Sequence, residues 1–140
     1  MRKKIAINGF GRMGRLALRA AWNFDFDIVH INELNGDVHT AAHLLCFDSI
    51  HGKWEKEVTV ANNSLIIEGK QVSYSRNNAI TETNWKSYDV DIVVECTGKH
   101  KSSNCLQAYL KSGVKKVVVS CPVKDGALNV VMGVNDALYD

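Results

Sequence analysis

Three glycines near the start of the chain are spaced as in a turn that holds a phosphate group. Gly9, Gly11 and Gly14 follow a short apolar run at residues 4–8 and precede residues 15–22, whose apolar positions have helical spacing. Glycines between a strand and a helix allow a tight bend, let the backbone approach a pyrophosphate, and let helix and strand pack closely. This pattern predicts a phosphate-binding turn.

Two main-chain amides and one acid complete that prediction. The N–H groups of Arg12 and Met13 stand at the start of the helix, where free donors and the helix dipole favour an anion. Glu33 closes a second apolar run, residues 28–32, nineteen residues after Gly14. An acid there accepts hydrogen bonds from an adenosine ribose and repels a 2′-phosphate, which favours NAD over NADP. The alternatives are a glycine-rich turn without a ligand and a solvated acid in a loop.

The rest of the chain alternates between strand and helix patterns. Apolar runs at residues 91–95 and 116–120 flank a helical pattern at 103–112. Residues 57–75 differ, because two turn signals separate three short strand patterns, which predicts an antiparallel β-meander. A further strand is predicted at 128–132. The fold class is therefore α/β, a Rossmann-type, doubly wound, mostly parallel sheet with an inserted meander.

Apolar spacing also predicts which helix faces are buried. Asp37 is a candidate N-cap for a second helix, and Gly113 is a candidate C-cap for the third. The small and apolar residues of the first helix predict one inner face, and a similar set predicts the inner face of the third helix. These residues are Met13, Leu16, Ala17, Ala20 and Ala21 in the first helix, and Cys105, Leu106, Tyr109 and Leu110 in the third.

Composition narrows the class of protein. The 140 residues fit one domain, residues 1–140, with a formal net charge of +2, which is too small to indicate nucleic acid or a membrane surface as a partner. The start of the chain lacks the apolar region of a signal peptide, and four cysteines without a CxxC pair indicate reduced thiols in a cytoplasmic protein. His39 and His43 lack a nearby third ligand, so no metal site is predicted.

Two further strand ends are expected at the same crevice as the glycine turn. Ligands of open α/β sheets bind at the carboxyl edge, where Cys96, Thr97 and Gly98 follow one predicted strand and Ser120 ends another. Their hydroxyl, thiol and amide groups can contact ribose or phosphate. These residue types are equally common in ordinary loops, so the spacing alone predicts a dinucleotide-binding domain and nothing more specific.

Residues 5–15 (IAINGFGRMGR) resemble the opening of the glyceraldehyde-3-phosphate dehydrogenase family. Similar landmarks follow in the family's order at residues 47–52 (FDSIHG), 95–98 (ECTG), 120–122 (SCP) and 131–135 (VMGVN). The resemblance implies the NAD-binding domain of a phosphorylating aldehyde dehydrogenase. Such an enzyme converts glyceraldehyde 3-phosphate, phosphate or arsenate, and NAD to an acyl phosphate or arsenate and NADH, and its ordinary setting is glycolysis.

The resemblance also implies roles for single residues. Arg76 is expected to contact the adenine through its backbone, while Thr97 and Ser120 lie near the ribose and phosphates. The chain departs from the family pattern where Glu33 replaces an Asp and where Lys99-His100 replaces a Val-Phe pair whose ring packs beside adenine. A third departure is Cys96 in place of a Ser. The implied cofactor-binding residues are Gly9, Phe10, Gly11, Arg12, Met13, Gly14, Glu33, Arg76, Cys96, Thr97, Gly98 and Ser120.

Alternatives within and beyond the family stay open on the sequence. Residues 31–34 and 96–98 also resemble erythrose-4-phosphate dehydrogenases. A branch associated with arsenic-resistance clusters, in which arsenate would replace phosphate, is more similar at residues 36–37, 42–45, 122–124 and 126–129 and at Trp54. A stand-alone, non-enzymatic NAD-binding module is a further alternative, as is a dinucleotide-binding domain from another reductase.

The resemblance finally implies what the 140 residues do not contain. In the family, the catalytic cysteine and the general-base histidine lie beyond the VMGVN landmark. We therefore expect no catalytic residue in this chain, a C-terminal catalytic half as its missing partner, and no aldehyde oxidation by the chain alone. In the family a C-terminal helix packs in a groove of the cofactor domain. An uncovered groove would be apolar, so we expect a homo-oligomer.

Overall fold

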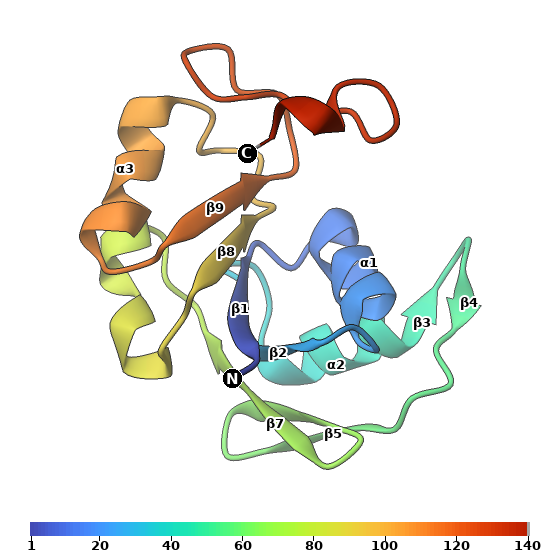
Figure 1. Cartoon of the computed structure of the whole chain (residues 1–140). Helices are drawn as coiled ribbons and strands as arrows, with labels where there is room; N and C mark the ends of the chain where they lie inside the picture. Colours follow the sequence, from blue (N-terminus) through green and yellow to red (C-terminus); the bar gives the residue numbers. More distant parts are fainter. Residues whose placement is uncertain (140) are drawn as a thin grey trace.

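A seven-stranded sheet, covered by helices on both faces, forms the centre of the computed structural model, which describes residues 1–139 (Figure 1). The sheet order is β5-β6-β7-β2-β1-β8-β9, and a separate two-stranded ladder joins β3 to β4. The elements are β1 (Lys3–Asn8), α1 (Arg12–Ala21), β2 (Phe26–Asn32), α2 (Val38–Cys46), β3 (Phe47–Asp48), β4 (Gly52–Lys53), β5 (Val58–Ala61), β6 (Ser64–Ile67), β7 (Lys70–Ser75), η1 (Ile80–Glu82), η2 (Trp85–Tyr88), β8 (Ile92–Glu95), α3 (Ser103–Lys111), β9 (Lys116–Val119) and η3 (Asp136–Leu138).

Five strands run parallel and set the position of the crevice. β1 pairs in parallel with β2 on one side and with β8 on the other, β7 pairs with β2, and β9 pairs with β8. The chain moves outward from β1 in one direction through β2 and β7, and in the other through β8 and β9. Such a sheet binds ligands at the carboxyl ends of the strands where the order reverses, here between β1 and β8. The predicted Rossmann-type α/β class is confirmed.

Two apolar cores lie on the two faces of the sheet. Alternation along β1 sends Ile7 to one face and Ala6 to the other. α1 and α2 cover the first face, where Leu18 and Leu45 are fully buried, and α3 covers the second with the two short helices η1 and η2 (Figure 1). Burial of apolar side chains on both faces holds the carboxyl edge of the sheet rigid.

The antiparallel meander is confirmed at residues 57–75. β5, β6 and β7 pair antiparallel, and β7 then joins β2 in parallel. Both hairpin turns have left-handed backbone conformations, with φ values of 49° and 55° at Asn62 and Asn63, and of 48° and 80° at Glu68 and Gly69. Such φ values suit two-residue turns between twisted strands.

The prediction of a strand at residues 128–132 is wrong, because this segment has no regular secondary structure. Side chains take up the backbone groups that a sheet ladder would use. Oδ1 of Asn135 accepts a hydrogen bond of 2.6 Å from the amide of Val131, and Nδ2 of Asn135 donates one of 2.9 Å to the carbonyl of Asn129. The side chain of Asn129 bonds in turn to the amide and the carbonyl of Val123, which precedes the segment. Competition of this kind favours loops over strands.

Helix positions are predicted better than helix faces. Asp37 caps α2 by accepting a hydrogen bond of 2.8 Å from the amide of Thr40, as predicted. In α1, however, the buried residues are Gly14 and Leu18, and Met13 is 57% exposed. In α3, Leu110 is 43% exposed rather than buried. Gly14 packs against the glycine turn, and Leu18, one helical turn further on, is buried in the core, so these two residues mark the inner face of α1.

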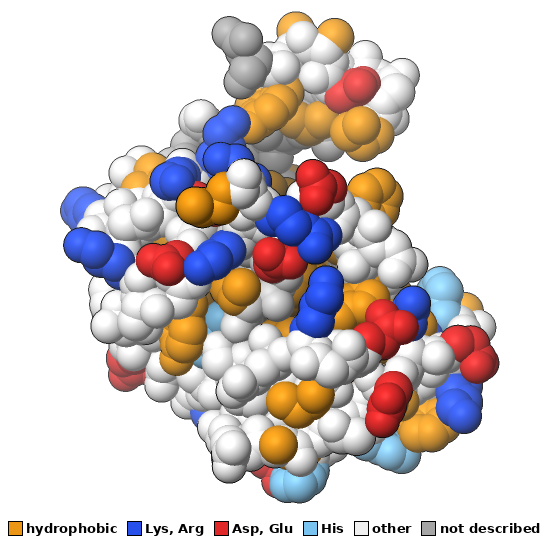
Figure 2. Space-filling model, turned by 60° about the horizontal axis from the view of Figure 1, so that its bottom comes forward, with side chains coloured by type: hydrophobic (Ala, Val, Ile, Leu, Met, Phe, Trp, Pro, Cys, Tyr) orange, Lys and Arg blue, Asp and Glu red, His pale blue; other side chains and the backbone are white. Residues whose placement is uncertain are grey.

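Positive and negative side chains are mixed on the surface, and exposed hydrophobic side chains are found near the end of the described chain. The face that Figure 2 shows intersperses Lys and Arg with Asp and Glu. Hydrophobic side chains are also visible at the top of the same view. In the last described segment, Val131, Met132, Val134 and Leu138 are each more than half exposed. Within residues 1–139, no helix is both long enough and apolar enough to cross a bilayer.

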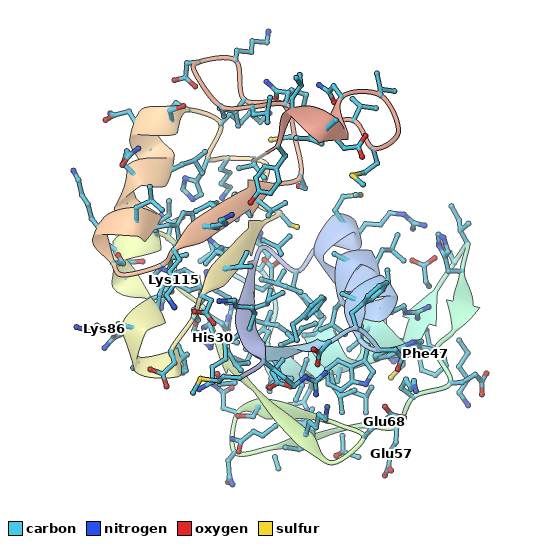
Figure 3. All side chains as sticks on the ribbon, viewed as in Figure 1. His30, Phe47, Glu57, Glu68, Lys86 and Lys115 are labelled. Carbon is cyan, nitrogen blue, oxygen red and sulfur yellow. The ribbon has the colours of Figure 1, made fainter. Side chains whose placement is uncertain are left out.

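His30 is a buried polar residue on the η2 side of the sheet (Figure 3). Its Nδ1 lies 2.7 Å from the hydroxyl of Ser73, and its Nε2 lies 2.8 Å from that of Ser75. The ring stacks on Tyr88 with the centroids 4.0 Å apart, and meets Trp85 edge-on. Burial lowers the pKa of His30 to about 4, so the ring is neutral at pH 7.

Candidate functional site

A cleft of about 190 Å³ opens at the carboxyl ends of β1, β2 and β8, the position that the sheet topology indicates. Main-chain groups, amide side chains, one acid and one lysine dominate its walls, so the cleft suits a polar ligand with hydroxyl and phosphate groups. It is lined by Asn8, Gly9, Gly11, Asn32, Glu33, Leu34, Asn35, Asn77, Asn78, Cys96, Thr97, Lys99 and His100.

The three glycines of the turn lack side chains for different physical reasons. A Cβ on Gly14 would lie 2.1 Å from the carbonyl oxygen of Gly9, and a Cβ on Gly9 would lie 2.6 Å from the amide nitrogen of Thr97. Gly9 also has a φ of +91°, which side chains rarely permit. A Cβ on Gly11 would meet nothing within 4 Å. The fold itself requires glycine at 9 and 14, whereas the absence of a side chain at Gly11 leaves room for a ligand.

The start of α1 presents free backbone donors beside that space. Gly11 is the N-cap, and no side chain caps the helix there. The amides of the first turn, including those of Arg12 and Met13, have no partner within the helix. These donors and the helix dipole favour an anion.

Glu33 links the end of β2 to the glycine turn. Its Oε2 accepts a hydrogen bond of 2.6 Å from the amide of Phe10, and its Oε1 accepts one of 2.8 Å from the amide of Asn35. An ionised carboxylate has about four acceptor positions, so two remain for ligand hydroxyls. The extra methylene of glutamate allows the carboxylate to reach the turn while still lining the cleft.

Arg12 connects the turn to the segment at residues 47–52. Its guanidinium lies 3.2 Å from Oδ1 of Asp48, whose side chain is only 6% exposed. The same oxygen accepts hydrogen bonds from the amides of Ile50 and His51 at 2.9 and 2.7 Å. These bonds, that of the His51 amide first, hold the pKa of Asp48 far below its usual range. The ion pair therefore stays charged at neutral pH.

A buried network of amide side chains forms the floor of the cleft. Nδ2 of Asn32 donates to Oδ1 of Asn8 at 2.8 Å and to the carbonyl of Asn77 at 2.9 Å. Oδ1 of Asn32 accepts from the hydroxyl of Ser75 at 2.7 Å and from the amide of Asn77 at 2.8 Å. These bonds join the ends of β1, β2 and β7, which fixes their spacing without any ligand.

Glu95 extends this network below the loop after β8. It is 1% exposed, and its Oε2 accepts hydrogen bonds from the hydroxyl of Tyr109 and from Nδ2 of Asn8. Its Oε1 accepts a bond of 2.7 Å from the amide of Thr97, which lines the cleft. Burial, and next the nearby Glu95 carboxylate, raise the pKa of Tyr109 well above its usual value. Tyr109 is thus a permanent donor to Glu95.

The predicted site residues occupy different places around the cleft. Gly9, Gly11, Glu33, Cys96 and Thr97 line it. The ring of Phe10 is buried in the core while its amide faces Glu33, and Gly14 packs against the turn. The other predicted residues stand outside the lining. Arg12 pairs with Asp48, Met13 is exposed, and Gly98 follows Thr97 with a φ of +69°. Arg76 donates a hydrogen bond of 3.3 Å to the carbonyl of Leu34, and Ser120 lies beside Cys96 with its amide bonded to the carbonyl of Glu95.

Asparagines are the cleft residues that the sequence reasoning missed. Asn77 and Asn78 line the cleft directly after Arg76, and Asn8 and Asn32 stand at the ends of apolar strands. A polar residue that closes an apolar run at the carboxyl edge of a parallel sheet was a usable signal for the latter two. Within residues 1–139, no group of three or more His, Cys, Asp or Glu residues is placed to hold a metal ion.

Comparison with known proteins identifies this arrangement. The family described as "Glyceraldehyde 3-phosphate dehydrogenase, NAD binding domain" matches residues 3–103, which include the glycine turn, Glu33 and the loop after β8. The chain belongs to the glyceraldehyde-3-phosphate dehydrogenase family. The sequence-based expectations for family, fold class and cofactor are confirmed.

Curated relatives carry the same name. Glyceraldehyde-3-phosphate dehydrogenase 3 of Nostoc sp. is 50% identical over 141 residues, covering 100% of this chain and 42% of that relative. The glyceraldehyde-3-phosphate dehydrogenase of Geobacillus stearothermophilus is 42% identical with the same coverage. That of Thermotoga maritima is 39% identical over 95% of this chain and 40% of its own length. The chain therefore spans about two fifths of the length of these relatives.

Proposed function

We propose that the cleft binds NAD with its pyrophosphate at the start of α1 and its adenosine ribose at Glu33. The observation that carries this proposal is the open space at Gly11, flanked by the free amides of the first helical turn and by the Glu33 carboxylate. The cavity is polar and wide enough for the ribose and phosphate groups, so the residues present fit this cofactor. When bound, NAD supplies a hydride acceptor, and the residues of this chain hold and orient it.

Each group of site residues takes one part of the cofactor. The amides of Arg12 and Met13 bind phosphate oxygens, and Glu33 accepts hydrogen bonds from the ribose hydroxyls. The adenine lies toward the backbone of Arg76 and the side chain of His100. The remaining cofactor-binding residues act in two ways: Gly9, Phe10, Gly11 and Gly14 shape the turn, while Cys96, Thr97, Gly98 and Ser120 bound the ribose and phosphate region after β8 and β9.

The reaction of the whole protein is proposed from its family. The chain is the cofactor domain of a phosphorylating aldehyde dehydrogenase that acts on glyceraldehyde 3-phosphate, with phosphate or arsenate as the acceptor. The catalytic thiol and its base belong to the C-terminal half, so the 140-residue chain binds NAD without oxidising aldehydes. The absorbance of NADH after mixing the purified chain with NAD, phosphate and the aldehyde tests this statement. A rise in that absorbance would refute it.

Two proposals concern the setting of the chain. Val118 on edge strand β9 and the exposed apolar side chains of residues 128–139 support self-association into a homo-oligomer. Light scattering at micromolar concentration tests it, and a monomer throughout would refute it. The four free cysteines support a cytoplasmic location, where thiols stay reduced.

Calorimetric titration of the purified chain with NAD and with NADP tests the binding proposal. We expect heat of binding with NAD and affinity at least tenfold weaker for NADP, because Glu33 repels a 2′-phosphate. Glu57→Gln, an exposed acid on the loop before β5, serves as a control and should bind NAD as the unmodified chain does. Absence of NAD binding, or equal affinity for both cofactors, would contradict the proposed roles of the turn and of Glu33.

A further inference from the structure

A thiol and an imidazole meet at the edge of the cofactor cleft. Cys105 is the third residue of α3, whose N-cap is Ser102. Its Sγ lies 3.1 Å from Nδ1 of His100, and both side chains are partly exposed. A ring nitrogen at that distance accepts the thiol proton directly, which is the arrangement of a nucleophile with its general base.

The surroundings of the pair include the positive end of a helix dipole and two lysines in the loop before that helix. Cys105 stands in the first turn of α3, at the positive end of the helix dipole, where its own amide bonds to the hydroxyl of Ser102 and the amide of Ser103 bonds to the carboxylate of Asp125. Lys99 and Lys101 flank His100 in the sequence and add positive charge to the same loop. Within the described residues, no hydrogen bond or ion pair joins an acidic side chain to the sulfur or to the ring; the Asp125 carboxylate at the start of α3 bonds to the amide of Ser103 at 3.0 Å.

The other cysteines of the chain lie in different surroundings. Burial raises the pKa of both Cys46 and Cys96, which keeps these thiols protonated. Of the four cysteines, all within the described range, Cys105 is the one whose sulfur contacts an imidazole nitrogen. The contrast with Cys46 and Cys96 predicts faster reaction at the Cys105 sulfur.

His100 also connects the pair to the cleft. His100 lines the cleft together with Lys99 and Thr97. A group attached to Cys105 Sγ must take space beside Nδ1 of His100, so the ring has to shift. A ligand in the cleft, in turn, restricts the ring and shields the sulfur.

We propose that Cys105 and His100 form a nucleophilic thiol–imidazole pair that is modified by small disulfides and other soft electrophiles, and that this modification and occupation of the cleft oppose each other. With a disulfide RS–SR, the Cys105 thiol passes its proton to His100 and the thiolate attacks one sulfur. The S–S bond of the reagent breaks, a new S–S bond joins Cys105 to one half, and the other half leaves as a thiolate that regains the proton as RSH. The disulfide is the oxidant, and no further reactant is needed.

Alkylation of the full chain by iodoacetamide, followed at each cysteine by peptide mass spectrometry, tests the nucleophile. We expect Cys105 to react about tenfold faster than Cys46 and Cys96. The variant His100→Asn should lower the rate at Cys105 toward theirs, whereas His39→Asn, which changes an exposed histidine on α2, should leave it unchanged. Equal rates at the three sulfurs in the unmodified chain would overturn the proposal even if His100→Asn fails to fold.

Glutathione disulfide and NAD test the link to the cleft, which rests on the proposed binding function. We expect glutathione disulfide to add one glutathione, at Cys105, and to weaken NAD binding in calorimetry at least threefold, and we expect saturating NAD to slow alkylation of Cys105. If NAD binds but neither effect appears, the opposition between modification and binding is wrong. If NAD does not bind at all while Cys105 still reacts fast, the proposed function fails and the reactive pair stands.

Discussion

The carboxylate of Glu33 accepts a hydrogen bond of 2.6 Å from the main-chain amide of Phe10, across 23 residues of sequence. The acid at the end of β2 and the glycine turn after β1 are therefore held as one unit. Asn35 donates to the other carboxylate oxygen, so the side chain is fixed at both oxygens before any ligand arrives. Preorganisation of this kind reduces the entropy that is lost on binding.

The substitution Glu33→Gln separates the charge of this side chain from its shape. The introduced glutamine keeps one acceptor oxygen, but it presents N–H donors to one of the two main-chain amides. Loss of hydrogen bonds to a charged group costs about 1.5–3 kcal/mol, so we expect NAD affinity to fall about 10- to 100-fold. NADP affinity should change much less, because the repulsion of its 2′-phosphate is also removed. Calorimetry with both cofactors measures the ratio, and an unchanged ratio would rule out a ribose role for Glu33.

Substitution of two glycines of the turn should have different effects, one on stability and the other on NAD affinity. A Cβ on Gly14 meets the carbonyl oxygen of Gly9 at 2.1 Å, so Gly14→Ala should lower the melting temperature strongly or prevent folding. A Cβ on Gly11 meets nothing within 4 Å, so Gly11→Ala should melt close to the unmodified chain and lose at least tenfold in NAD affinity. Thermal melts and titrations of both variants check this. Full NAD affinity in Gly11→Ala would show that the pyrophosphate passes elsewhere.

The sequence predicts local structure well because its signals are local. The turns at Asn62-Asn63 and Glu68-Gly69 need only two adjacent residues that tolerate positive φ, and the glycine turn needs three. The failed strand at residues 128–132 has suitable apolar residues. Its backbone, however, bonds to the side chain of Asn135 at the amide of Val131 and the carbonyl of Asn129, a competition that apolar spacing does not register.

The contacts that complete the site are long-range, and the sequence alone does not show them. Arg12 and Asp48 are 36 residues apart, and Asn8 and Tyr109 are 101 apart. Arg12 and Asp48 lie in segments that the sequence singled out, and Tyr109 is predicted on the inner face of its helix, but the pairings depend on how α1, β3 and α3 pack on the sheet. The Cys105–His100 contact, by contrast, spans five residues, yet it requires the loop after β8 to fold back on the start of α3.

Removal of the Asp48 charge should release Arg12 and destabilise residues 48–52. The folded state holds the pKa of Asp48 far below its usual value, chiefly through the amide of His51. The carboxylate therefore contributes stability that is present above its unfolded pKa of 3.8 and is lost as pH falls through the lower folded value. We expect Asp48→Asn to be less stable than the unmodified chain at pH 7, with a smaller difference at pH 3.

Urea unfolding at the two pH values measures that difference. Asp25→Asn is a matched control, because Asp25 is 95% exposed and its ion pair with Arg2 is on the surface. Exposed pairs contribute little to stability, so this variant should unfold with the unmodified chain. An Asp48→Asn variant as stable as the control at pH 7 would argue against an anchoring role for the ion pair.

His30 should make the protein sensitive to mild acid. Its folded pKa of about 4 lies below the unfolded value of 6.5, so the unfolded state binds a proton first as pH falls. The stability contributed by neutral His30 is complete above pH 6.5 and is lost progressively between pH 6.5 and about 4, by on the order of 3 kcal/mol. In His30→Gln this part of the pH dependence should vanish, whereas the exposed-residue variant His39→Gln should retain it. Urea unfolding across this range gives both slopes, and parallel slopes in all three proteins would exclude His30 as the cause.

Tyr109→Phe should lower both the stability of the protein and its affinity for NAD, because Tyr109 connects the core to the cofactor cleft through Glu95. The tyrosine hydroxyl donates to the buried carboxylate of Glu95, which in turn accepts the amide of Thr97 in the cleft wall. Without the hydroxyl, Glu95 stays buried with one donor fewer, at a cost of about 1–3 kcal/mol in unfolding free energy. Water or a shifted Asn8 must then satisfy Glu95, which loosens the Thr97 amide, so NAD affinity should fall as well. Tyr139→Phe removes an exposed hydroxyl near Lys116 and should change neither property. Lower stability with unchanged NAD affinity in Tyr109→Phe would confine Glu95 to the core and disconnect it from the cofactor cleft.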